Sequence, residues 1–439
     1  MRTYSMRIVV MLAGMVLVSA CGNEPNSGRN TAEDSKTEAR KDYTKEPAEL
    51  VFFGVPAGPA EAWDEKVGNA MRKRFPDYKF TYIPRGGTNT LENFVATGTQ
   101  VDIIQDSVGN SANSLIPTGL QYDLTELVKK HNVDLNRFEP ATIEAVKQFG
   151  GLYGFPINNG GLVLYYNKDI FDKFGVAYPK DGMTWDEAIE LGKKLTRSEN
   201  GRQYIGLAAS ANHALGMSSY SLPFVDKATE KAAVNNDKYK AIVETLILAP
   251  AQNPGYKEKV ASLKRTFLND DFSKDQYIGM FVMNYGLQNN KEFDTFNWDM
   301  AALPVFKENP GVGTQPYPDF YFISQTSKYK DQAMEVLKFL TSDEFQMEMS
   351  KKGHVPVLKN ESVKKAFAQD SKFKSKNVVN ALFTNKYASP IARTKYDSRV
   401  NGPLLSHLAK VIVGEEDLNT ALRSAEEEAN KAIEAMKSK

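Results

Sequence analysis

The chain has 439 residues, of which 41% are hydrophobic and 25% charged, an ordinary balance for a soluble globular protein large enough for two domains. Its formal net charge is only +1, which argues against a nucleic-acid partner. It has a single cysteine, so no disulfide can form within one chain.

The first twenty residues predict a signal peptide. Arg2 and Arg7 precede an apolar run, Ile8 to Val18, that is well short of the roughly 20 residues needed to span hydrocarbon. The run leads into Leu17-Val-Ser-Ala-Cys21, which resembles the lipobox of bacterial lipoproteins. The resemblance implies that Cys21 becomes the acylated amino terminus, palmitate being one acyl chain, and anchors the protein on the extracytoplasmic face of the cell membrane.

Residues 21–46 predict a flexible tether. They are rich in Asn, Ser, Glu, Lys and Thr and hold scarcely any large apolar residue, so they cannot bury enough surface to fold.

The next part of the chain alternates between strand-like and helix-like segments. These are strands at 49–54, 79–83 and 101–105 and helices at 59–74 and 90–97. Such alternation predicts an α/β fold with a mostly parallel, doubly wound sheet. Ligands of these sheets bind beyond the carboxyl ends of strands, so the loops after Phe53 and Ile104 are the first candidate sites.

A glycine-rich segment from Gly150 to Phe171 predicts a hinge strand leading into a second domain. Residues 308–318 hold three prolines and predict a second crossing. Further predicted elements are strands at 298–306 and 319–324 and helices at 185–195, with Thr184 as N-cap, and at 331–340, 344–349 and 418–436. We expect one lobe to comprise 47–156 and 318–372, and the other 157–317 and 373–439.

Four stretches, taken together, resemble the maltose-binding type of extracellular solute-binding protein, the capture component of bacterial ABC sugar importers. They are 152–156; 164–171 with 184–187; Gly279-Met280; and 323–328 running into 337–342. The resemblance implies two lobes, each a mixed, mostly parallel sheet flanked by helices, joined by hinge strands and closing on a ligand. It also implies permease subunits and an ATPase encoded elsewhere, a monomer that is not an enzyme, and no cofactor or metal.

Two departures from the family pattern bear on the ligand. The segment Val282 to Gln288 lacks the tryptophan that many members have there, and Pro316 to Phe320 replaces a glycine-rich turn. We expect Tyr285 or Tyr317 to supply the missing stacking surface.

Sugars present hydroxyls around an apolar ring face, so a sugar site needs aromatic platforms beside amides or carboxylates. Position and residue type nominate Glu61, Trp63, Asp106, Ser107, Asn158, Asn159, Tyr220, Asn284, Tyr285, Tyr317 and Asp319, with an oligosaccharide as the expected ligand. Structural roles compete with binding at several of these positions. Trp63 has the helical spacing of a core residue, Asp106 could cap the following segment, and the two asparagines could serve the hinge turn.

Three other functions remain open from the residues alone. A peptide or amino-acid receptor would use a fixed charge such as Arg85, Arg393 or Arg399. A metal receptor could use Tyr165-Tyr166, although adjacent strand residues point to opposite faces, and the four histidines show no ligand spacing. A glycosidase would need two carboxylates, for which Asp106 and Asp319 are candidates.

Overall fold

The structure is a computed structural model that describes residues 41–55 and 58–438, and Asp42–Lys439 form one compact unit. The predicted signal peptide, Cys21 and residues 22–40 of the predicted tether lie outside the described residues. Among the helices of the described part, none combines the length and apolar character needed to cross a membrane.

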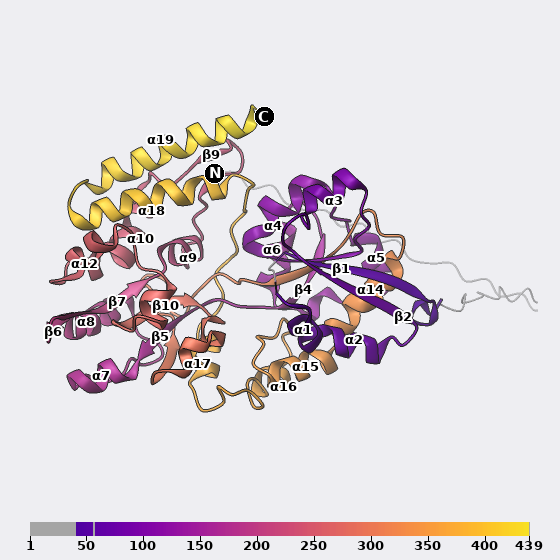
Figure 1. The fold of residues 1–439 in the computed structure, drawn as a ribbon, viewed down its shortest axis with the longest axis horizontal. Helices are drawn as coiled ribbons and strands as arrows, with labels where there is room; N and C mark the ends of the chain where they lie inside the picture. The colour runs from indigo at the N-terminus through magenta and orange to yellow at the C-terminus, as the bar shows by residue number, and fades with distance from the viewer. Residues whose placement is uncertain (1–40, 56–57, 439) are drawn as a thin grey trace, which may run out of the picture. The chain divides into compact units, whose positions relative to one another are not determined.

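The first sheet has the strand order β2-β1-β3-β12-β4. Three of its strands, β1, β2 and β4, are labelled in Figure 1. Its strands are β1 (Ala48–Gly54), β2 (Tyr78–Pro84), β3 (Ile103–Ser107), β4 (Gly154–Asn158) and β12 (Asp319–Ile323). β1 is parallel to β2 and β3, whereas β12 is antiparallel to both β3 and β4. Four strands therefore run one way and β12 runs the other, which confirms the predicted mixed, mostly parallel sheet for this lobe.

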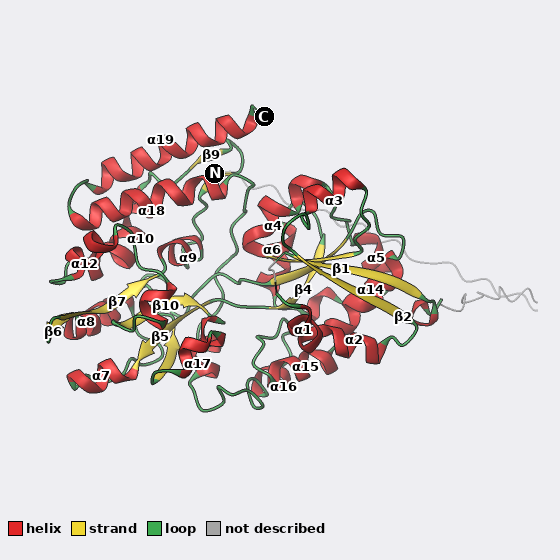
Figure 2. Ribbon diagram, in the orientation of Figure 1, coloured by secondary structure: helices red, strands yellow, loops and turns green. Residues whose placement is uncertain are grey.

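Helices flank this sheet (Figure 2), and a polar side chain caps the start of three of them, α3, α15 and α16. They are α1 (Ala60–Trp63), α2 (Asn69–Arg74), α3 (Leu91–Thr97), α4 (Val108–Ser114), α5 (Thr125–Lys130), α6 (Pro140–Lys147), α14 (Lys330–Leu340), α15 (Asp343–Lys351) and α16 (Glu361–Lys365). A π-helical stretch, Asp64–Gly68, joins α1 to α2. Thr90 caps α3 by accepting from the backbone N–H of Asn93 at 3.1 Å, and Gly98 ends the helix in a left-handed conformation.

The second sheet has the order β11-β5-β10-β7-β6. Its strands are β5 (Leu162–Asn167), β6 (Arg197–Glu199), β7 (Arg202–Ala209), β10 (Ile278–Asn284) and β11 (Trp298–Ala302). Only β7 and β10 are parallel neighbours, so this sheet is mixed and has fewer parallel pairs than the first. The reason is that β5 arrives straight from β4 through residues 159–161 and runs antiparallel to both β10 and β11.

The helices around the second sheet include two long ones that the chain contributes last. The set is α7 (Lys168–Phe174), α8 (Trp185–Leu195), α9 (Ala211–Gly216), α10 (Asp237–Val243), α11 (Ala249–Ala251), α12 (Tyr256–Leu263), α13 (Asn269–Ser273), α17 (Val378–Phe383), α18 (Asp397–Val413) and α19 (Leu418–Lys437). A two-stranded ribbon pairs β8 (Val225–Asp226) with β9 (Lys231–Ala232). Thr184 caps α8 as predicted, and it forms a capping box with Glu187.

The α8 helix lies unusually close to β7 because both carry glycine at the contact. A side chain on Gly206 would collide with the backbone carbonyl of Gly192. Such close approach is one reason for glycine inside a strand.

Each sheet has its own hydrophobic core, and we call the two bodies the first and second lobes. Trp63 belongs to the core of the first lobe, whereas Trp185 and Trp298 belong to the core of the second. The chain passes between the lobes at 159–161, between β11 and β12, and between α16 and α17. Two lobes with flanked α/β sheets are what the family resemblance implies.

Candidate functional site

Three polar side chains lie in a row across the first sheet, at the carboxyl ends of two neighbouring parallel strands and the amino end of the reversed strand between them. Ser107 ends β3, Asn158 ends β4, and Asp319 begins the reversed strand between them. Asp319 is in register with Ser107 on one side and with Asn158 on the other. The carboxyl ends of β3 and β4 and the amino end of β12 therefore meet at one place, where ligands of α/β sheets bind.

Asp106 lies immediately beneath this row with its side chain fully buried. Its Oδ1 accepts from the backbone N–H of Ser107 at 2.8 Å, and the hydroxyl of Ser114 donates to its Oδ2. Burial raises the pKa of Asp106 to about 7; the Ser114 and Ser107 bonds oppose the rise, the charge of Asp319 adds to it, and Arg85 opposes it. Near neutral pH this carboxyl can therefore be a hydrogen-bond donor as well as an acceptor.

Tyr317, from the crossing between β11 and β12, packs against the same row. Its backbone N–H donates to the carbonyl of Gly160 at 3.1 Å, and its phenol fills the space in front of Gly109, where no side chain would fit. Burial raises the pKa of Tyr317 above its ordinary value, so the phenol stays neutral; Arg393 and a hydrogen bond to Ser107 oppose the rise.

Arg393 brings positive charge to the row from the segment before α18. Its Nη2 donates to the carbonyl of Gly216 at 3.3 Å. Burial lowers the pKa of His213, and Arg393 lowers it further. The sequence nominated Arg393 only for a peptide receptor, since it lies in a segment with no periodic or motif signal to place it.

A cavity of about 260 Å³ extends the site beyond Asp106. The loops after β1 and β2, the helices α3 and α4 and Ser398 line it: Phe53, Val55, Arg85, Thr90, Leu91, Glu92, Asn110, Asn113, Ser114 and Ser398. The side-chain oxygen of Asn113 is buried there and has no hydrogen-bond partner among the described residues. This volume is just below the range of roughly 300–1,000 Å³ typical of ligand pockets, so the cavity accommodates a small ligand or one part of a larger one.

Two further contacts lie on the other side of the row. Lys66 forms an ion pair with Asp319 at 3.5 Å. The hydroxyl of Tyr285 donates to the carbonyl of Gly353 at 3.0 Å and so links the second lobe to the first. Next to Gly353, burial lowers the pKa of His354 to about 3, with Lys66 and Lys352 contributing, which keeps the imidazole neutral.

The remaining nominated residues lie elsewhere or have structural partners. Trp63 is buried and stacks on Tyr82, with ring centroids 4.9 Å apart. Glu61 is exposed in the first turn of α1. Tyr220 packs edge-on against Phe306 in the second lobe.

The two other asparagines differ in their hydrogen bonding. Asn159 is buried in the first crossing, where its Oδ1 accepts from the backbone N–H of Gly160 at 2.8 Å. Asn284 ends β10, and its Oδ1 is buried with no hydrogen-bond partner in the described part of the chain.

The structure also places the residues on which a metal receptor or a glycosidase would depend. Tyr165 and Tyr166 both lie in the core of the second lobe, and the hydroxyl of Tyr165 donates to Gln288 at 2.5 Å. Across residues 41–55 and 58–438, no group of three or more His, Cys, Asp or Glu side chains is placed to hold a metal ion. Asp106 and Asp319 influence each other electrostatically, but Asp106 is held by Ser107 and Ser114.

Curated relatives match the chain at low identity. A putative binding protein of Brucella abortus is 24% identical over 298 residues, which are 65% of this chain and 66% of the relative. An arabinooligosaccharide-binding protein of Bacillus subtilis is 26% identical over 43% of this chain and 41% of its own length. An sn-glycerol-3-phosphate-binding periplasmic protein of Rhizobium meliloti is 25% identical over 76% of this chain and 80% of its own. The chain thus spans just under two thirds of the first of these relatives and less than half of the second.

Solved structures match over more of the chain. An ABC substrate-binding protein of Listeria monocytogenes in complex with cycloalternan superposes with a TM-score of 0.68 at 19% identity, covering 89% of this chain and all of that one (100%). A cyclic α-maltosyl-1,6-maltose-binding protein of Arthrobacter globiformis gives 0.67 at 16% identity, with 89% and 100% covered. At these identities the likeness shows the fold, and it confirms the two-lobed architecture.

A sequence model of one family, described as bacterial extracellular solute-binding protein, matches residues 56–347. That range includes the second sheet, all of the first sheet except β1, and two of the three crossings between the lobes. This chain belongs to the bacterial extracellular solute-binding protein family.

Proposed function

We propose that this protein is the capture subunit of an ABC importer and binds a carbohydrate, with an oligosaccharide as the expected form, at the row formed by Ser107, Asp319 and Asn158. Tyr317 and Arg393 flank the row, and Tyr285 approaches it from the second lobe. The protein holds the sugar without altering it covalently and delivers it to membrane permease subunits.

The observation that carries the proposal is the register of β12. Because Asp319 lies between Ser107 and Asn158, a carboxylate, a hydroxyl and an amide share one edge of the sheet. Together they offer both donors and acceptors, as sugar hydroxyls require. The phenol of Tyr317 adds an aromatic surface at the same edge.

The ligands for which similar proteins are named support carbohydrate as the ligand class. They include an arabinooligosaccharide, cycloalternan, mannobiose and maltotetraose. A ligand that touches both lobes would favour the closed arrangement, because only differential contacts can shift a conformational equilibrium.

A phosphate-bearing polyol is a second candidate. Relatives named for sn-glycerol-3-phosphate match up to 85% of the chain. Arg85 lines the cavity beside Asp106, and Arg393 lies near Tyr317, so guanidinium groups flank the row. Guanidinium groups bind phosphate through paired hydrogen bonds.

Isothermal titration calorimetry against oligosaccharides, sn-glycerol-3-phosphate, peptides and amino acids tests both candidates. We expect Asp319→Ala to weaken binding of the preferred ligand at least tenfold, because a hydrogen bond to a charged group contributes about 1.5–3 kcal/mol. Tyr220→Phe, outside the row, is the matched control. Carbohydrate binding that survives Asp319→Ala unchanged would refute the assigned site, and cleavage of an oligosaccharide would refute the non-enzymatic role.

The lipid anchor on Cys21 is part of the same proposal. Two or more acyl chains hold a protein stably to a bilayer, whereas one gives marginal binding. Expression in a bacterium fed labelled palmitate should label the native chain and leave Cys21→Ala unlabelled. Equal labelling of both would contradict the assignment.

A further inference from the structure

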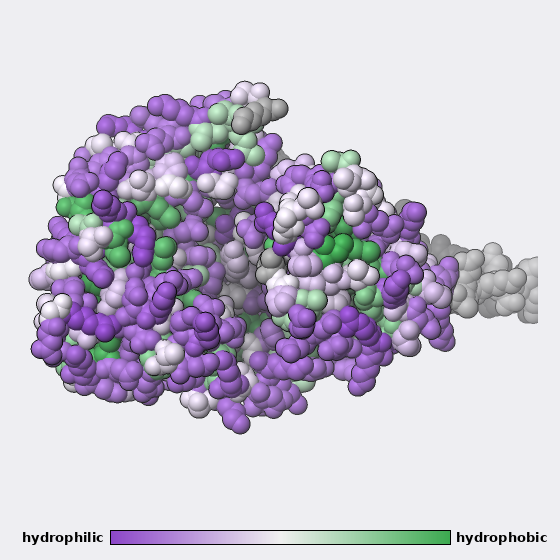
Figure 3. Space-filling view, in the orientation of Figure 1, coloured by the Kyte–Doolittle hydropathy of each residue, from purple (hydrophilic) through white to green (hydrophobic). Residues whose placement is uncertain are grey.

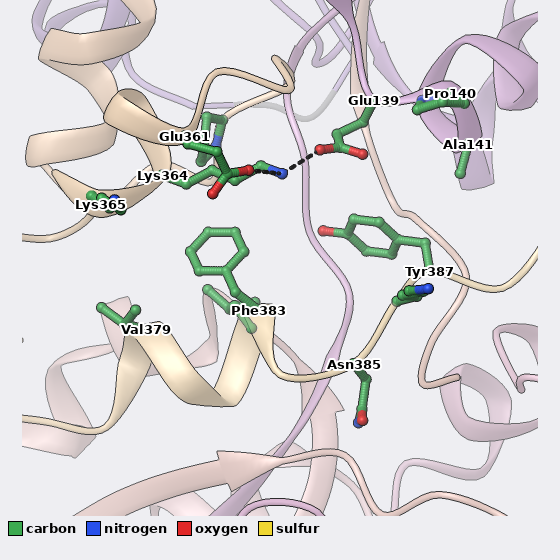
Figure 4. Close-up of a pocket in the computed structure, with 13 residues that line it drawn as sticks. Glu139, Pro140, Ala141, Glu361, Lys364, Lys365, Val379, Phe383, Asn385 and Tyr387 are labelled. Atoms are coloured by element: carbon green, nitrogen blue, oxygen red, sulfur yellow. Dashed lines mark ion pairs between the residues drawn. The ribbon is translucent and has the colours of Figure 1, made fainter. Parts of the chain in front are cut away.

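A second and larger cavity, of about 620 Å³, lies away from the polar row (Figure 4). Its walls come from the start of α6, from α16, from α17 and from the segment that follows α17. The lining residues are Glu139, Pro140, Ala141, Pro356, Glu361, Lys364, Lys365, Val379, Leu382, Phe383, Asn385, Lys386 and Tyr387. None of these residues belongs to the site described above.

One wall carries a carboxylate–ammonium–carboxylate group. Lys364 Nζ forms ion pairs with Glu139 at 2.6 Å and with Glu361 at 3.3 Å, as the dashed lines in Figure 4 mark. Glu139 and Lys364 are only 20% and 24% exposed, so water screens this pair less than a surface ion pair. Carboxylates have several acceptor positions each, so this wall can bond sugar hydroxyls while the ion pairs persist.

Two aromatic side chains, Phe383 and Tyr387, also line the cavity. Phe383 lies across the cavity from Tyr387, whose hydroxyl points toward the space between Phe383 and Lys364 (Figure 4). Phe367 braces the Phe383 ring in an edge-on contact, with centroids 5.4 Å apart. The Tyr387 hydroxyl is buried; the Asn159 side chain acts on its oxygen as a hydrogen-bond donor, whereas its own O–H has no acceptor in the described part of the chain. A buried, unpaired donor is unfavourable unless a water or ligand completes it.

We propose that this cavity is a second carbohydrate-binding site, in which a sugar ring packs on Phe383 and its hydroxyls bond Tyr387, Glu139 and Lys364. The cavity has the aromatic face, acidic groups and unpaired hydroxyl donor that a sugar needs. Its volume falls within the range of roughly 300–1,000 Å³ expected for small-molecule sites.

The position of the cavity gives its occupant a mechanical role. The helix α16 is tied to α15 of the first lobe, because Ser350 donates to the carbonyl of Val363 at 2.6 Å. Phe383 follows Val378 and Ala381, which belong to the core of the second lobe. The Tyr387 ring lies beside Gly161 in the first crossing, 3.5 Å from where a side chain at that glycine would begin. A sugar bridging these walls therefore stabilises one arrangement of the lobes and couples to ligand binding at the row; such coupling is reciprocal.

Fluorine NMR of the full mature chain, with para-fluorophenylalanine at position 383, tests the proposal. The probes are glucose, mannose, maltose and mannobiose, each titrated to high millimolar concentration. We expect a saturable fluorine shift with at least one sugar, weakened about fivefold or more by Tyr387→Phe, because that change removes the unpaired donor. The exposed-surface variant Leu268→Ala is the matched control and should leave the titration unchanged, and circular dichroism confirms that each variant folds.

Asp319→Ala separates this proposal from the function assigned to the row. We expect the fluorine titration to persist in Asp319→Ala while calorimetric binding at the row is weakened at least tenfold. Absence of a saturable shift with all four sugars, its loss in Asp319→Ala, or an unchanged titration in Tyr387→Phe would each overturn the second site. A fluorine response without any binding at the row would instead overturn only the assigned function.

Discussion

Replacing Asp106 by asparagine should stabilise the protein, and more so as the pH rises. The buried carboxyl has a pKa of about 7 in the folded chain against an ordinary value of 3.8. Between these values the unfolded chain loses its proton while the folded chain keeps it, so stability falls as pH increases. With 1.36 kcal/mol per pKa unit, the loss is about 1.7 kcal/mol at pH 5 and about 4 kcal/mol at pH 8. Asparagine keeps the acceptor for the Ser107 N–H and cannot ionise, so it avoids this loss.

Urea denaturation of the native protein and Asp106→Asn at pH 5 and pH 8 measures the effect. The free energy of unfolding of the variant, relative to that of the native protein, should rise by about 2–3 kcal/mol from pH 5 to pH 8. All other titrating groups are shared by the two proteins, so their contributions cancel in this difference. Asp319→Asn is a useful second variant, because removing its charge should lower the pKa of Asp106 and reduce the pH dependence. A difference between Asp106→Asn and the native protein that is the same at both pH values would refute the reasoning.

Three further predictions concern stability and use the same denaturation assay. Thr184→Ala removes the capping box of α8 and should cost about 1 kcal/mol; no change would mean that the cap contributes nothing measurable. Gly206→Ala should cost about 3 kcal/mol because its side chain meets backbone, whereas Gly402→Ala has open space in α18 and should gain about 0.5–1 kcal/mol; equal effects would contradict the contact. Burial alone would raise the pKa of Asp271, but hydrogen bonds led by those from Arg265 at 2.7 and 3.1 Å hold it below its ordinary value. The stabilisation is therefore present above that ordinary value and lost as pH falls below it, so Asp271→Asn should cost about 3 kcal/mol at pH 7 and much less under acid conditions.

Elements with strong local signals could be predicted from the sequence. The α8 helix begins with a capping box and carries an apolar stripe, and β1 is a short apolar run that ends in glycine. The sequence indicated α18 far less clearly, since Gly402 and Pro403 both lie within it. Packing of α18 against α19 overrides the weak helical preference of those residues, which a local pattern does not reveal.

Long-range pairing limited the prediction of the site. The sequence placed Asp106 and Ser107 in a loop after β3, yet both belong to that strand and are buried. It nominated Asp319 by residue type, but it gave no means of knowing that β12 inserts between β3 and β4. Arg393 likewise reaches the site through tertiary contacts, and the second cavity draws its walls from four separate segments, so neither has a local signature.

The insertion of β12 also constrains the order in which a newly made chain can fold. Until residues 319–323 have been synthesised, β4 has no partner in its sheet, and β3 is paired on one side only. Exposed strand edges recruit other chains, so the nascent polypeptide remains prone to aggregation until most of its length is available. A fragment ending before Asp319 should accordingly precipitate or bind chaperones, whereas a nascent chain that extends well past Ile323 can close the sheet.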